Sequence, residues 1–140
     1  MRTFHFQPIK GKAHEILNAI LQTPEIASCG LQDVMLLRLA CEEIVVNITS
    51  YAYPEGSDGF LDIEIQKNDR IIIRFIDGGS PFNPLEQPTP DTELHWKHRR
   101  IGGLGIFLVT RKMDNTCYVY EENKNVLTIE KVINNTRDKD

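Results

Sequence analysis

The sequence Ala40-Cys41-Glu42-Glu43-Ile44-Val45-Val46-Asn47 lies in the middle of the longest run that is compatible with a helix. On a helix, Glu43 and Asn47 would project from one face, because they are four residues apart. Apolar residues at helical spacing predict a buried stripe on another side, formed by Leu37, Cys41, Ile44 and Ile48. A carboxylate and an amide held side by side over an apolar wall fit a hydrated metal ion or a reacting hydroxyl. An ordinary solvated polar face is the alternative at this point.

Two helices are predicted before residue 54. Apolar residues at helical spacing between Ala13 and Leu21 predict a first amphipathic helix, which Pro24 closes. Asp33 is expected to cap the second helix, which must end before Pro54 because the residue that precedes a proline avoids the helical region. The β-branched part at 44–48 lacks strict alternation, so we expect it to continue this helix.

The second half of the chain predicts mainly strands. Alternating or β-branched segments between turn signals indicate five strands in all, at residues 3–7, 60–67, 70–76, 117–120 and 126–133, with turns at 68–69 and 121–125. A glycine-led helix is expected over 102–113, and 134–140 is expected to be a polar tail. The segment 81–100 holds four of the seven prolines and little periodicity. It is expected to be a long irregular loop, often the form of an active-site lid.

This order of elements predicts a single domain of the α+β class over residues 1–140. Helices precede a mostly antiparallel sheet that one helix interrupts, which is typical of a two-layer α/β sandwich with helices on one face. A chain of 140 residues is long enough to bury a real core. We see no internal repeat, linker or second domain in the pattern.

Composition and charge limit the class of partner. A net charge of −4 and a pI near 5.6 argue against nucleic acid and anionic membranes, because phosphate groups demand concentrated positive charge. The first residues lack the apolar core of a signal peptide, and no run approaches a spanning length, so a cytoplasmic protein is expected. Cys29, Cys41 and Cys117 fit neither a disulfide framework nor a zinc site, and we interpret them as reduced core residues.

Two further stretches suit ligand chemistry. In Asp77-Gly78-Gly79-Ser80-Pro81, a carboxylate at a strand end can accept a hydrogen bond from an amino group, while the glycines let a flat ligand approach the backbone. In Gly102-Gly103-Leu104-Gly105, backbone N–H groups at a helix start favour an anion, and the preceding Lys97-His98-Arg99-Arg100 cluster can reach a phosphate. A plain turn, a flexible helix start and a solvated loop are the alternatives.

Taken together and in order, Glu43-x-x-x-Asn47, Asp77-x-Gly79-x-Pro81 and Gly103-Leu104-Gly105 resemble the N, G1 and G2 boxes of the GHKL ATPases. That superfamily includes gyrase B, heat-shock protein 90, histidine kinases and MutL. Within it, Ala52-Tyr53-Pro54, the Ser80-Pro81-Phe82-Asn83-Pro84 sequence and the short lid are most similar to the RsbW-like anti-sigma factor serine kinases. The resemblance runs roughly from the first helix to Val132 and implies a Bergerat-type ATP-binding fold.

The resemblance implies a role for each matched residue. Asn47 matches the asparagine that coordinates Mg²⁺ between the ATP phosphates, and Glu43 the glutamate expected to act as general base. Asp77 matches the aspartate that accepts the adenine amino group, and Gly79 the glycine beside the base. The lid residues expected to hold the phosphates are Gly102, Gly103, Leu104, Gly105 and Arg100.

Two positions depart from the family pattern. Tyr51 stands where many relatives have a histidine, so any role of that imidazole is absent here. Ile101 stands where some relatives carry an arginine near the γ-phosphate, so Arg99 or Arg100 would have to substitute for it. These departures bear on the rate of transfer more than on ATP binding.

The implied function is an ATP-binding, Mg²⁺-dependent serine/threonine protein kinase of the partner-switching type. The histidine domain of a sensor kinase and a gyrase-type transducer domain are not seen, so the expected acceptor is a serine on a separate protein. A STAS-domain anti-anti-sigma protein is the expected partner, a sigma factor is a further candidate, and a homodimer is a candidate assembly. The alternatives are a non-catalytic ATP-gated module that regulates a non-sigma partner, and an interaction domain without nucleotide.

Overall fold

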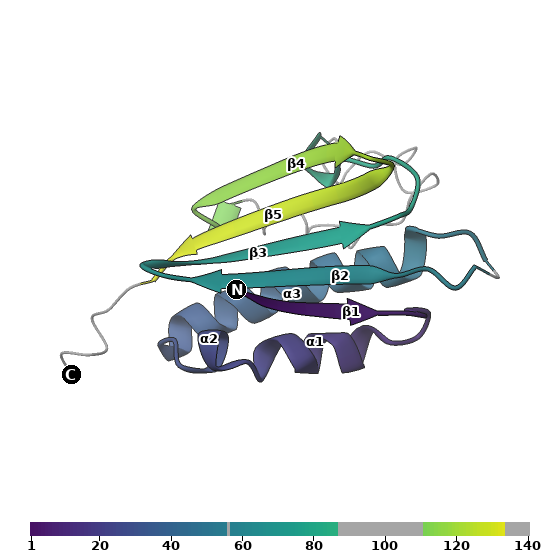
Figure 1. Ribbon diagram of the computed structural model, residues 1–140. Helices are drawn as coiled ribbons and strands as arrows, with labels where there is room; N and C mark the ends of the chain where they lie inside the picture. The colour runs from purple at the N-terminus through teal and green to yellow at the C-terminus, as the bar shows by residue number, and fades with distance from the viewer. Residues whose placement is uncertain (56, 87–110, 134–140) are drawn as a thin grey trace.

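The computed structural model describes residues 1–55, 57–86 and 111–133, which form one sheet with helices on one face (Figure 1). The elements, in chain order, are β1 (Arg2–Phe6), α1 (Ala13–Leu21), α2 (Pro24–Ala27), α3 (Leu31–Tyr51), β2 (Leu61–Lys67), β3 (Arg70–Asp77), a short 3₁₀ helix (Pro84–Glu86), β4 (Asn115–Glu121) and β5 (Lys124–Val132). The expected α+β fold with an antiparallel sheet and helices on one face is confirmed. The single-domain organisation over the whole chain stays a prediction.

The five strands lie in the order β1-β2-β3-β5-β4, and every neighbouring pair is antiparallel. The register places Asp77, the last residue of β3, opposite Leu61 on β2 and opposite Asn125 on β5. The end of β3 and the beginning of β5 therefore lie side by side at the end of the sheet that α3 also reaches (Figure 1).

Alternation along the central strands sends one apolar row toward the helices. Leu61, Ile63 and Ile65 of β2 and Ile71, Ile73 and Phe75 of β3 are fully buried. They share one core with the stripe predicted on α3, whose four members Leu37, Cys41, Ile44 and Ile48 are all buried. Each large apolar side chain removed from water contributes about 1.5–3 kcal/mol, so this packing fixes the rotation of α3 about its axis.

One expectation about the first half of the chain needs correction. Gly30, not Asp33, is the N-cap residue of α3; Asp33 lies in the first turn and is buried. The helix begins three residues earlier than expected, and Gly30 has the extended backbone of an N-cap residue, with φ −63° and ψ 157°. Pro24 does more than close α1, because it begins the four-residue helix α2, a position where its missing N–H costs nothing. The predicted turn at 68–69 is confirmed, because β2 ends at Lys67 and β3 begins at Arg70.

The β4–β5 hairpin is tighter than expected. Its turn consists of Glu122 and Asn123, with φ angles of 53° and 64°, the left-handed pair that a two-residue hairpin requires. Asn125 therefore belongs to β5 and is buried, although we expected it in the turn. Cys117 is exposed rather than in the core, because it pairs with Thr128 and so points to the sheet face opposite to the buried Leu127 and Ile129. Cys29 and Cys41 are buried as expected.

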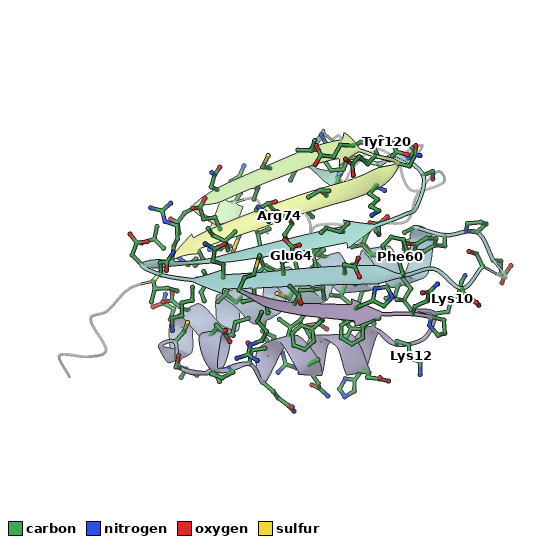
Figure 2. The ribbon with its side chains drawn as sticks, in the orientation of Figure 1. Lys10, Lys12, Phe60, Glu64, Arg74 and Tyr120 are labelled. Carbon is green, nitrogen blue, oxygen red and sulfur yellow. The ribbon has the colours of Figure 1, made fainter. Side chains whose placement is uncertain are left out.

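The sheet face away from the helices carries an ion pair between β2 and β3. Figure 2 shows Glu64 and Arg74 beside each other on β2 and β3, and Arg74 Nη1 donates to Glu64 Oε1 at 2.8 Å. An exposed pair of this kind contributes about 0–1 kcal/mol, so burial on the helical face carries the fold.

Three expected segments lie largely or wholly outside the described residues. Of the helix predicted over 102–113, only its end is described, and residues 111 and 112 are helical. The tail 134–140 and most of the predicted lid are not described. Among the helices that are described, none combines the length and apolar character needed to cross a membrane.

Candidate functional site

A pocket lies where the second half of α3 faces the ends of β3 and β5. Its lining residues come from α3, from the segment after β3 and from the β4–β5 hairpin; they are Ile44, Asn47, Ile48, Asp77, Phe82, Pro84, Tyr118, Asn125 and Leu127. Asn47 and Asp77, 30 residues apart in the sequence, thus face one pocket. The lining combines apolar side chains with one carboxylate and two amides, which suits a flat ligand with a polar edge.

Asp77 is a buried carboxylate, with 4% of its surface exposed. Its Oδ1 accepts hydrogen bonds from the Gly79 backbone N–H at 2.8 Å and from Asn125 Nδ2 at 3.0 Å. A buried charge needs such donors, because taking a carboxylate out of water without partners is costly. The arrangement leaves a fixed, strongly accepting group in the wall of the pocket.

Asn125 is the site residue that sequence reasoning missed. Its Nδ2 donates to Asp77 Oδ1 and to the backbone oxygens of Gly79 and Ser80, at 3.0, 3.2 and 3.0 Å. Its Oδ1 accepts from the Phe82 backbone N–H at 3.1 Å and from the Tyr118 hydroxyl. Residues 125, 127 and 129 are all buried. Their spacing of two along the strand is the sequence signal that could have placed Asn125 on the inner face.

Gly79 is needed for packing against the end of α3. A Cβ built there would lie 2.3 Å from the backbone oxygen of Ala52, just beyond the end of α3. The turn after β3 is therefore pressed against the helix end. The neighbouring Gly78 donates its N–H to the Tyr53 hydroxyl at 2.7 Å, and this hydroxyl donates to the Phe60 oxygen at 2.6 Å. These contacts hold the turn beside the pocket.

Gly79→Ala should therefore destabilise the protein by about 1–3 kcal/mol, the usual range for overpacking. The matched control is Gly78→Ala, whose Cβ would lie 2.7 Å from the Phe60 ring, a side chain that can move. Urea unfolding of both variants measures the difference. A Gly79→Ala midpoint no lower than that of Gly78→Ala would show that the turn is not pressed against the helix.

Asn47 and Glu43 occupy successive turns of α3. Asn47 is buried, with 5% of its surface exposed, and it lines the pocket. Glu43 is half-buried and is not among the lining residues of this pocket. Burial raises the pKa of Glu43, and the charge of the adjacent Glu42 raises it further. A raised pKa makes the Glu43 carboxylate a stronger base than an ordinary glutamate.

The residues present fit a magnesium ion that arrives with phosphate groups. Mg²⁺ prefers hard oxygen donors and is usually held by one or two protein side chains together with substrate phosphates and waters. The buried amide of Asn47 offers one such oxygen at the pocket wall. Within the ranges that the structure describes, no group of three or more His, Cys, Asp or Glu side chains could hold an ion alone.

The structure thus brings together part of the predicted site. Asn47 and Asp77 line the pocket, Gly79 donates its backbone N–H to Asp77, and Glu43 lies one helical turn before Asn47. The predicted lid residues lie outside the described residues; they are Arg100, Gly102, Gly103, Leu104 and Gly105. The role of each of these residues stays a prediction.

Comparison with known proteins finds one family and a set of related kinases. The family model of the histidine kinase-like ATPase domain matches residues 10–131. A serine-protein kinase RsbW of Listeria monocytogenes serovar 1/2a is 30% identical over 96 residues, which cover 65% of this chain and 61% of the relative. Proteins of the same name from Listeria monocytogenes serotype 4a and Listeria innocua serovar 6a are 31% identical over 101 residues, with the same coverage. The chain therefore spans about 61% of the length of these relatives.

Proposed function

The chain belongs to the family of histidine kinase-like ATPase domains, and on that premise we propose that it binds Mg-ATP and transfers the γ-phosphate to a serine or threonine of another protein. Family membership agrees with the resemblance of its three motifs to the GHKL boxes. The observation that carries the proposal is the pocket that Asn47 and Asp77 share.

Recognition of adenine is assigned to Asp77. Its buried carboxylate is an acceptor, and the exocyclic amino group of adenine is a donor. The apolar side chains of Ile44, Ile48 and Leu127 line the same pocket and would cover the faces of the ring. A ligand that presents an acceptor to Asp77 would leave a buried group unmatched, at a cost of about 1–3 kcal/mol.

Transfer of the phosphoryl group is assigned to α3. Asn47 would hold the magnesium ion through its amide oxygen, and the ion would supply charge neutralisation at the phosphates. Glu43 would accept the proton of the acceptor hydroxyl while the hydroxyl oxygen forms its bond to the γ-phosphorus and the bond to the ADP oxygen breaks. The spacing of one helical turn between Glu43 and Asn47 keeps the base and the metal ligand apart.

The proposed partner is a STAS-domain anti-anti-sigma protein that carries the acceptor serine. The name of the Listeria relatives, serine-protein kinase, supports serine as the acceptor. A role as an anti-sigma factor, a sigma factor as second partner, a homodimer and a cytoplasmic location are parts of the same proposal. The test is transfer of labelled γ-phosphate to a STAS protein encoded beside this chain; label that stays on ATP with every such partner would refute the kinase proposal.

Asn47→Ala tests the magnesium assignment. The variant loses the side-chain oxygen. We therefore expect the factor by which Mg²⁺ raises ATP affinity to be at least about 10-fold smaller than in the wild type. Titrations of ATP with Mg²⁺ and with a chelator measure this increment. The control is Asn18→Ala, an exposed position on α1. An unchanged increment in folded Asn47→Ala would remove Asn47 from the metal site.

The position of Glu43 favours a second candidate function. Because Glu43 is not among the residues lining the pocket, the chain also fits a non-catalytic module in which ATP gates the binding of a partner. The half-buried carboxylate with its raised pKa supports the kinase instead. The Glu43 experiment described below separates the two.

A further inference from the structure

Two side chains from neighbouring strands meet beside Asp77. Asn125 lies near the beginning of β5, and Tyr118 lies on β4 as its diagonal neighbour on the same face of the hairpin. The Tyr118 hydroxyl donates to Asn125 Oδ1, and it also accepts from the Phe82 backbone N–H at 3.2 Å. Tyr118 is half-buried, so its ring packs at the pocket while its hydroxyl reaches the amide.

The contacts of Asn125 allow one orientation of its amide. Two donors, the Tyr118 hydroxyl and the Phe82 N–H, face Oδ1. Three acceptors, namely Asp77 Oδ1 and the backbone oxygens of Gly79 and Ser80, face Nδ2, so its two protons are shared among them. A flipped amide would set an oxygen against three acceptors and an NH₂ group against two donors. The amide is therefore a fixed part of the site.

We propose that Asn125, oriented by Tyr118, is a positioning residue that aims the Asp77 carboxylate at the nucleotide base and so sets base selectivity. Of the two donors that fix Asp77 Oδ1, one is the backbone of Gly79 and the other is Asn125. Without Asn125, Asp77 Oδ1 loses one of these two donors, so the carboxylate is held less firmly in one orientation. This inference rests on the proposed ATP site.

The same amide also shapes the rest of the pocket wall. Through the oxygens of Gly79 and Ser80 and the N–H of Phe82, Asn125 holds the turn that follows β3. Phe82 itself lines the pocket. A loosened amide should therefore impair the match between Asp77 and the amino group of the base more than the contacts with phosphates, which depend on other residues.

The test compares ATP with inosine triphosphate, which carries an oxo group in place of the amino group. We expect the wild type to prefer ATP by about 10-fold or more, because a buried carboxylate rejects an oxo group. Tyr118→Phe keeps the ring and removes the hydroxyl, so the ATP preference should fall about 5-fold, the equivalent of one hydrogen bond. Asn125→Ala should lower it further. The control is Tyr120→Phe on the same strand, an exposed residue labelled in Figure 2.

The outcomes separate the inference from the proposed function. The inference alone would be overturned if the ATP preference were unchanged in Tyr118→Phe and Asn125→Ala, including the case in which both variants lose affinity equally for the two nucleotides. The pair would then act only on folding. A wild type without any preference for ATP would overturn base recognition by Asp77 and the inference with it. Urea titration shows whether Asn125→Ala is folded. If it is not, the ATP preference of Tyr118→Phe alone tests the inference, and Tyr120→Phe is expected to match the wild type.

Discussion

Glu43→Gln is expected to lower phosphate transfer by ~10²-fold or more, the usual scale of general-base catalysis, while ATP affinity stays close to that of the wild type. Glutamine keeps the shape of the side chain and removes the basic oxygen. Asn47 and Asp77, which are assigned to the metal and the base, stay in place, so binding and transfer should separate. Transfer of labelled γ-phosphate to a STAS protein, run beside nucleotide titrations, measures both quantities.

The pH dependence of transfer should report the same carboxyl group. Burial and the charge of Glu42 raise the pKa of Glu43, so the base becomes protonated at a higher pH than an ordinary glutamate. Activity should fall as the pH drops through this raised pKa. Glu42→Gln removes the neighbouring charge, lowers the pKa of Glu43 and should move the acid limb of the pH–rate profile to lower pH. An acid limb at the same pH in both proteins would assign it to another group.

Glu43→Gln is not expected to lower the free energy of unfolding. A carboxyl group whose pKa is higher in the folded than in the unfolded protein stabilises the fold below its unfolded pKa, and this contribution is lost as the pH rises through the folded pKa. At neutral pH, the ionised Glu43 therefore costs stability, and glutamine should leave the free energy of unfolding unchanged or raise it. Glu55→Gln, the same change at an exposed position, is the control for transfer at neutral pH.

Two results would contradict the kinase. If folded Glu43→Gln transfers phosphate as fast as the wild type, Glu43 is not the base. If the wild type binds ATP tightly but transfers no phosphate to any STAS partner, the ATP-gated module is the better description of the chain.

Asp77→Asn should weaken ATP binding by about 10- to 100-fold, equivalent to the ~1–3 kcal/mol cost of a buried mismatched group. The Gly79 N–H and Asn125 Nδ2 both donate to Asp77 Oδ1 and would hold the oxygen of the new amide. The NH₂ group of that amide would then face the amino group of adenine, donor against donor. Calorimetric titration of ATP measures the loss.

The control for this prediction is Asp58→Asn, which makes the same change at an exposed position. Urea unfolding shows whether each variant is folded. Unchanged ATP affinity in folded Asp77→Asn would place the base in another pocket and would remove the observation on which the proposed function depends.

The sequence alone predicted the features that depend on local spacing. Helix α3 could be read from the 3.6-residue period, and the relative placement of Glu43 and Asn47 followed from their spacing of four residues. The strands followed from alternation, because a half-buried strand has a period of two. The order of the three motifs was enough to indicate the family, which the match to the histidine kinase-like ATPase domain shows.

Tertiary structure was needed for the features that depend on contacts between distant segments. Asn125 joins Asp77 only because the register of β3 and β5 pairs them, and no local pattern specifies that register. Gly79 is required because the backbone of Ala52 lies against it, a contact between segments 27 residues apart. In each case the free energy of long-range packing and pairing outweighs the local preference that a sequence pattern records.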